Sequence, residues 1–174
     1  MTDPQPHPNP MVAVSTSGER DILEAFVEGY REQVRGRVAG VSEEAARRRL
    51  VGSATTLGGI IKHLRWVELA WFERVLAQRP EDELPTRPGS AEDPDADFRL
   101  EDDETLDQIL AAYDRQCEIS RTVAKDFSLD DTGPHRRFGD VSLRWIYVHM
   151  IEETACHAGH ADILRELIDG SVNE

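Results

Sequence analysis

The sequence RWIYVHMIEETACHAGHADILRELIDG, residues 144–170, carries the longest helical pattern in the chain. Apolar side chains recur along it at the three- and four-residue intervals that place them on one face of an α-helix. These side chains are Ile146, Met150, Leu164 and Leu167. Gly170 is a typical helix stop. We therefore predict a helix over residues 142–168 whose apolar face packs into the protein core.

Polar side chains interrupt this apolar face. With about 100° per residue, Glu153 and His157 fall within about 40° of each other, on the arc of the apolar residues. A buried carboxylate without a partner costs several kcal/mol. A divalent metal is one such partner, because Glu and His at i and i+4 point to the same place. A hydrogen-bonded Glu–His–His network without a metal explains the same pattern.

A metal site needs a third ligand, and three histidines are candidates for it. His149 and His160 lie on the same arc as Glu153, and His63 stands at the edge of the apolar stripe of an earlier helix. Cys156 also lies within a turn of Glu153. It fits three roles, namely a fourth ligand, a redox-sensitive thiol or a small core residue.

Three more amphipathic helices precede the last one. We predict them over residues 17–38, 55–78 and 104–127, with a short helical segment opening at Ser42. We find no competing strand signal, so the predicted fold is an all-α four-helix bundle over residues 17–174. A proline-rich stretch at residues 1–16 is predicted to be a disordered tail.

The connection between the second and third long helices is long and acidic. Residues 81–104 hold eleven acidic side chains against Arg87 and Arg99, a net charge of −9. Long connections of this kind include lids and binding loops. The charge favours a solvated acidic loop.

Composition excludes some classes of partner. The chain has 34 acidic and 20 basic residues, a formal charge of −14, which argues against nucleic acid. No apolar run approaches the roughly 18 residues that a membrane span requires. The N-terminus has no signal-peptide pattern, and only two cysteines are present, so we expect a cytoplasmic protein.

Two motifs resemble the DinB-like superfamily of bacterial four-helix-bundle proteins, and the resemblance covers nearly all of residues 18–170. The first motif is LGGIIKHLRWVE, which contains His63, and the second runs from Glu153 through His157 to His160. By position, His63 matches the first metal ligand of the superfamily and His157 the last. Glu153 stands where most relatives have histidine. The set is similar to the His/Glu/His zinc triad of mycothiol-dependent maleylpyruvate isomerase.

The resemblance implies a divalent metal held by His63, Glu153 and His157, with zinc favoured and nickel or iron also compatible. It further implies an S-transferase in which a low-molecular-weight thiol of the mycothiol type attacks a small electrophile. His160 or His149 would then accept a proton or orient a ligand. Many bundles of this superfamily form homodimers.

Other functions fit the same residues. One is a stress-response or binding protein whose metal site is structural or vestigial. Another is oxygen chemistry, because two histidines and one carboxylate also form the facial triad of non-haem Fe(II) oxygenases.

Overall fold

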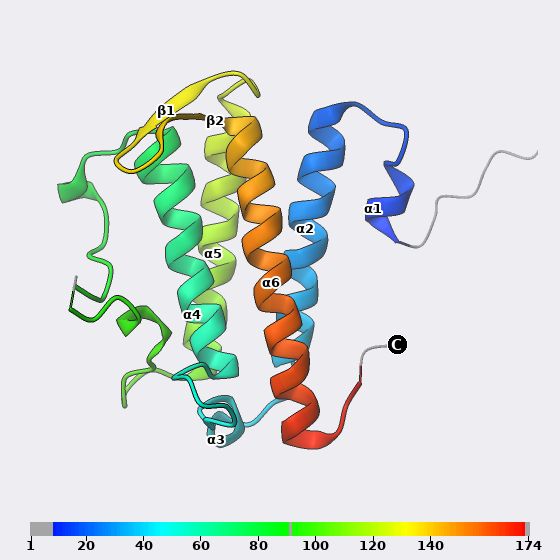
Figure 1. Ribbon diagram of the computed structural model, residues 1–174, viewed down its shortest axis with the longest axis vertical. Helices are drawn as coiled ribbons and strands as arrows, with labels where there is room; N and C mark the ends of the chain where they lie inside the picture. Colours follow the sequence, from blue (N-terminus) through cyan, green and yellow to red (C-terminus); the bar gives the residue numbers. More distant parts are fainter. Residues whose placement is uncertain (1–8, 91, 173–174) are drawn as a thin grey trace, which may run out of the picture.

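The computed structural model describes residues 9–90 and 92–172 of the chain. Four long helical segments lie side by side as a bundle (Figure 1). They are α2 (Glu19–Val38), α4 (Leu57–Glu68) with its continuation η1 (Leu69–Leu76), α5 (Leu106–Lys125) and α6 (Leu143–Asp169). The predicted all-α four-helix bundle is confirmed. No helix among the described residues is long and apolar enough to cross a membrane.

Three of the long helices, α4, α5 and α6, begin where a side chain satisfies a free backbone N–H group. The Thr56 side chain accepts a hydrogen bond from the N–H of Gly59 at the start of α4. At the start of α6, the Ser142 side chain accepts a hydrogen bond from the N–H of Trp145. Thr105 forms a reciprocal capping box at the start of α5. Gly170 closes α6 with φ of 76°, a left-handed conformation that glycine adopts without strain. The predicted boundaries therefore hold to within about two residues.

The second long helix changes geometry part of the way along. After Glu68 it continues as the π-helix η1, which the sequence did not predict. π-helical turns are rare and are frequent at functional sites. Here η1 presents Trp71 and Arg74 to a cavity described below.

A short hairpin joins α5 to α6 and corrects the prediction of a chain without strands. Strands β1 (Thr132–His135) and β2 (Gly139–Ser142) pair antiparallel over four residues each. Strands this short carry too few residues for an alternating apolar pattern to emerge. The hairpin lies directly on η1, since a Cβ added at Gly133 would fall 2.0 Å from the carbonyl oxygen of Val75.

The remaining segments are short helical turns. Ahead of the bundle, α1 (Pro10–Ala13) lies within the predicted tail, whose residues 1–8 fall outside the described part of the chain. Helix α3 (Glu43–Ala46) begins at Ser42 as predicted. The acidic connection contains two 3₁₀ turns, η2 (Glu81–Glu83) and η3 (Ala96–Phe98), and η3 lies against α4.

The buried face of α6 is rotated from the predicted one. Ile146, Met150 and Leu164 are buried as predicted, whereas Leu167 is 52% exposed, so its assignment to the core was wrong. The buried set also includes Leu143, Thr154 and Ala161. Its centre lies about 80° around the helix from Glu153, at about 100° per residue. Glu153 and His157 therefore stand at the margin of the core and not in its middle.

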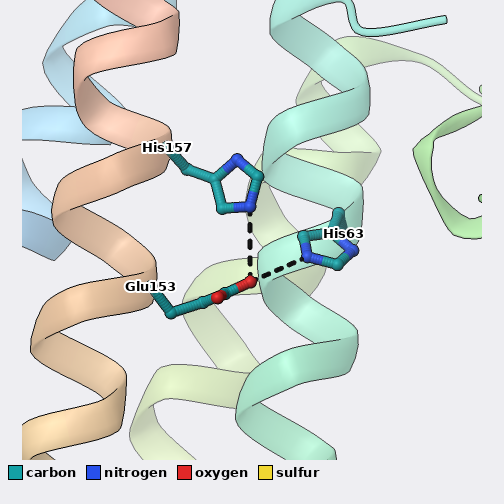
Figure 2. Close-up of side chains that lie close together, drawn as sticks. All are labelled: His63, Glu153 and His157. Atoms are coloured by element: carbon teal, nitrogen blue, oxygen red, sulfur yellow. Dashed lines mark hydrogen bonds and ion pairs between the residues drawn. The ribbon is translucent and has the colours of Figure 1, made fainter.

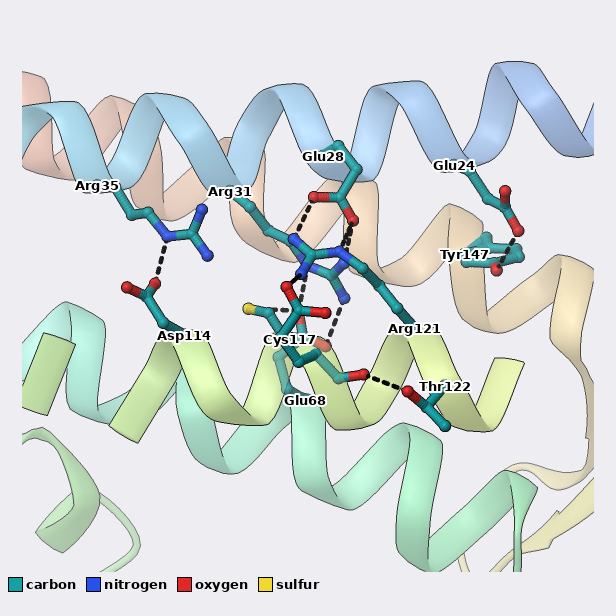
Figure 3. A network of polar contacts seen from close by, with 11 residues as sticks. Glu24, Glu28, Arg31, Arg35, Glu68, Asp114, Cys117, Arg121, Thr122 and Tyr147 are labelled. Carbon is teal, nitrogen blue, oxygen red and sulfur yellow. Dashed lines mark hydrogen bonds and ion pairs between the residues drawn. The ribbon is translucent and has the colours of Figure 1, made fainter. Parts of the chain in front are cut away.

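A buried ion pair links α2 to α4 inside the bundle. Arg31 Nε and Nη2 donate to the two carboxylate oxygens of Glu68 at 2.8 and 2.6 Å, and both side chains are almost fully buried (Figure 3). Glu28 adds a second carboxylate to Arg31, and Arg121 on α5 binds Glu28 in turn. Cys117 lies beside Glu68, and burial raises the pKa of its thiol to about 12. Each buried charge in this cluster has an opposite charge in contact, as low dielectric surroundings require.

Candidate metal centre

Three side chains from two helices converge on one point. His63 projects from α4, and Glu153 and His157 project from successive turns of α6 (Figure 2). The Oε1 atom of Glu153 lies 3.2 Å from Nε2 of His63 and 3.3 Å from Nε2 of His157. The three ligand atoms all lie within 4.8 Å of one another. Within residues 9–90 and 92–172, no other group of three or more His, Cys, Asp or Glu residues meets that criterion.

This spacing fits a tetrahedral metal ion. Zinc binds imidazole nitrogen and carboxylate oxygen at about 2.0–2.2 Å, so two ligand atoms of one tetrahedron are separated by about 3.3 Å. The two distances from Glu153 match that edge length. Two imidazoles and one carboxylate are also a donor set of catalytic zinc sites, which keep one position for water or substrate.

The charges at the centre suit a cation. Hydrogen bonds from His157 and then from His63 outweigh burial and hold the pKa of Glu153 well below its usual range. Glu153 is therefore an anion throughout the physiological pH range. Nδ1 of His157 is buried and has no hydrogen-bond partner among the described residues. Its Nε2 faces Glu153, so this nitrogen is the one available to a metal.

Asp97 contacts the candidate centre, which the sequence did not predict. It lies in η3 with no exposed surface, and its Oδ2 is 2.9 Å from Nδ1 of His63. Arg87 donates to the same oxygen at 2.7 and 3.1 Å. Burial alone would raise the pKa of Asp97, but His63 and Arg87 lower it below its usual value. Since an ionised carboxylate only accepts, Nδ1 of His63 donates to Asp97, and Nε2, which donates to Glu153 in the metal-free protein, is the nitrogen that would bind a metal after losing its proton.

The acidic connection is therefore more than a solvated loop. The ring of Phe98 stacks on the imidazole of His63 with 3.9 Å between the ring centroids. This close approach depends on Gly59, because a Cβ there would lie 2.2 Å from the carbonyl oxygen of Phe98. Lys62 fixes the next segment by donating to the carbonyl of Arg99 at 2.7 Å. The prediction of a solvated loop is wrong for the segment around Asp97, which forms a wall of the centre.

Three other residues that the sequence singled out lie outside the group. His149 stacks on Trp145 and meets Trp71 edge-on, with centroid distances of 5.2 and 4.6 Å. His160 is exposed, and its ring lies edge-on to His157 at 5.6 Å. Cys156 is exposed, so it is no core residue. The rotation of the buried face of α6 turns these three side chains away from the point where Glu153 and His63 meet.

A cavity of about 610 Å³ begins at His63 and follows α4 and η1 toward the hairpin. Its walls combine aromatic rings with arginine side chains, and the candidate metal ligand His63 belongs to its lining. Cavities of this size hold small organic ligands. The candidate centre thus has a cavity beside it that is large enough for a small organic molecule.

The comparisons with known proteins agree with this arrangement. The sequence model of the family described as Mycothiol-S-transferase matches residues 22–170. This range holds all but the first turn of α2, the other three long helical segments in full, and the three converging side chains. No curated protein matches the chain. The matched family lies within the DinB-like superfamily, so the resemblance seen in the sequence is confirmed. The chain belongs to the mycothiol S-transferase family.

Proposed function

We propose that this protein is a metal-dependent S-transferase that joins a low-molecular-weight thiol of the mycothiol type to a small electrophile. The observation that carries the proposal is the convergence of His63, Glu153 and His157 beside a cavity of ligand size. Membership of the mycothiol S-transferase family supports a thiol as one substrate.

His63, Glu153 and His157 would hold the ion, with zinc favoured and nickel or iron compatible with the same donors. A divalent ion supplies Lewis acidity, which lowers the pKa of a thiol that binds at its open position. Asp97 holds the ring of His63 with Nε2 toward Glu153, so that this nitrogen would face a bound ion.

The reaction needs no nucleophile from the protein. The thiol loses its proton and its sulfur forms a bond to carbon of the electrophile. An activated halide then breaks its carbon–halogen bond and releases a halide ion, whereas an epoxide opens its carbon–oxygen bond and takes up a proton. His160, which is exposed and lies against His157, is the candidate to accept the thiol proton. Cys117 is unsuitable as a nucleophile, because burial raises its pKa to about 12 and keeps the thiol protonated.

The test is conjugation of a panel of thiols, mycothiol among them, to 1-chloro-2,4-dinitrobenzene by metal-free and metal-loaded protein. We expect conjugate to form only with the loaded protein, and Glu153→Gln to abolish it. Glu152→Gln is the matched control, since the neighbouring Glu152 is largely exposed and points away from the centre. Equal rates with and without protein for every thiol would favour a structural or vestigial metal site. A cytoplasmic location and a homodimer stay predictions.

A further inference from the structure

The cavity beside the metal centre has a distinct end far from the metal. His63 is the first lining residue along the helical wall and Arg74 is near the last, with Trp66 and Ala70 between them. The wall from His63 to Arg74 is about three helical turns long. The hairpin lies at the far end, where Pro134 and Arg136 line the cavity. A ligand that reacts near His63 can therefore extend toward the hairpin.

The cavity is electropositive although the chain is acidic. Three arginines and one glutamate line it, in a chain of net charge −14. Arg74 is neutralised by Glu81, with Nε to Oε1 at 2.6 Å, and Arg87 is neutralised by Asp97.

Arg136 is the lining cation without a partner. Its side chain makes no hydrogen bond or ion pair with any residue in 9–90 or 92–172. The neighbouring His135 senses this charge, since burial and then Arg136 lower the pKa of its imidazole. A guanidinium without a partner at a cavity wall is a ready site for a carboxylate, which it binds by charge-assisted hydrogen bonds.

Aromatic side chains form part of the same walls. Trp71 stacks on His135 with 4.9 Å between the ring centroids and 21° between the planes, and Trp66 also lines the cavity. Flat unsaturated groups stack favourably on such rings. The thiol is anchored at its sulfur in the proposed function, whereas the electrophile has no such anchor and depends on the protein for binding.

We propose that the cavity binds a flat electrophile that bears a carboxylate, and that Arg136 recognises the carboxylate. This inference rests on the proposed function and names the substrate class of its second co-reactant. For an electrophile with a carbon–carbon double bond next to a carbonyl, the sulfur bonds to one alkene carbon. The other alkene carbon receives a proton to replace the one that the thiol releases, so no oxidant or reductant is needed.

The experiment compares trans-3-benzoylacrylate with its methyl ester, which present one reactive alkene with and without a carboxylate. The measured quantity is the kcat/KM for the acid divided by the kcat/KM for the ester, determined with metal-loaded, full-length protein. This ratio should be about tenfold lower in Arg136→Gln than in wild type, and the decrease should come from a higher KM for the acid. Arg137→Gln is the matched control. That arginine adjoins Arg136, lies over the Phe138 ring at 5.6 Å and does not line the cavity, so the wild-type ratio should persist.

A binding measurement keeps this inference separate from catalysis. Unreactive 3-benzoylpropionate should quench the fluorescence of Trp66 and Trp71, and Arg136→Gln should raise its Kd about tenfold in both metal-free and metal-loaded protein. Absence of conjugation with either electrophile would overturn the proposed function, while the probe Kd would still test Arg136. An unchanged acid-to-ester ratio and an unchanged Kd would overturn this inference. A raised KM for the thiol in place of the electrophile would overturn it as well.

Discussion

The carboxylate of Asp97 lies 2.9 Å from Nδ1 of His63 and is completely buried there. The two residues come from different parts of the fold, one from the acidic connection and the other from the middle of α4. Arg87 shares the same carboxylate oxygen. The acidic connection thus reaches the back of a candidate metal ligand, and the orientation of His63 depends on it.

Replacing Asp97 should weaken metal binding without removing a ligand. We expect Asp97→Asn to lower zinc affinity about 10- to 100-fold, because residues that orient a ligating histidine have effects of that size. Asp95→Asn is the matched control, since Asp95 is exposed and lies two residues away. Calorimetric titration of the metal-free proteins with zinc checks this, and equal affinities for the two variants would contradict it.

A methyl group at Gly59 should disturb the same contact from the other side. The Cβ of Gly59→Ala would fall 2.2 Å from the carbonyl oxygen of Phe98, so η3 must move away from α4. We expect a loss of about 1–3 kcal/mol in the free energy of unfolding, together with weaker zinc binding.

Gly159→Ala is the control for the effect of glycine on helix stability. A Cβ at Gly159 meets no described atom within 4 Å, so this change should stabilise α6 by about 0.5–1 kcal/mol. Urea unfolding of both variants measures the difference. Equal stabilisation by the two substitutions would show that the contact between Gly59 and Phe98 is not close.

Removing one partner of the buried ion pair should lower the free energy of unfolding much more than replacing both partners by apolar side chains. Glu68→Gln leaves the Arg31 charge inside the bundle with less compensation, and we expect a loss of about 3–5 kcal/mol. The double variant Arg31→Met/Glu68→Leu should be more stable than Glu68→Gln, because it leaves no buried charge. Glu19→Gln removes a partner of an exposed pair with Arg144 and should cost below about 1 kcal/mol. Chemical unfolding would contradict this account if Glu68→Gln and Glu19→Gln had similar effects.

Glu28 should make stability depend on pH. Burial raises its pKa, but Arg121 and Arg31 more than offset this and lower the pKa below its ordinary value. Its stabilisation is then fully present above the unfolded value of about 4.3 and is lost as pH falls through the lower folded value. Since the side chain is 34% exposed, Glu28→Gln should cost only about 1 kcal/mol at pH 7. In unfolding experiments near pH 3, the difference in free energy of unfolding between wild type and Glu28→Gln should be smaller than at pH 7. The same difference at both pH values would contradict this prediction.

The long helices were predictable because their sequences are locally consistent. Thr56 and Gly170 are a start and a stop signal of known mechanism, and both lie within a residue of the observed ends. The pairing of Glu153 with His157 was also predictable, since their four-residue spacing fixes them on one helix face. His63 was selected from the three candidate histidines through the resemblance alone. It lies at the edge of the apolar stripe of its helix, and that position does not require its side chain to face the interior.

The rest of the site depends on contacts that a sequence does not specify. Asp97 is one of eleven acidic residues in 81–104, and only the close approach of η3 to Gly59 distinguishes it from the others. The positions of His149 and His160 depend on the rotation of α6, which is set by the helices packed against it. A rotation of α6 about its own axis moves a side chain from the core to the surface, although the spacing of that residue along the helix stays the same.

The most direct test of this account is the metal content of purified protein after loading with zinc and removal of free ions. Elemental analysis should find about one ion per chain in the wild type and in His149→Ala, whose side chain lies outside the group. The same analysis should find less than about a tenth of that in His157→Ala. An equal metal content in wild type and His157→Ala would contradict a centre formed by His63, Glu153 and His157.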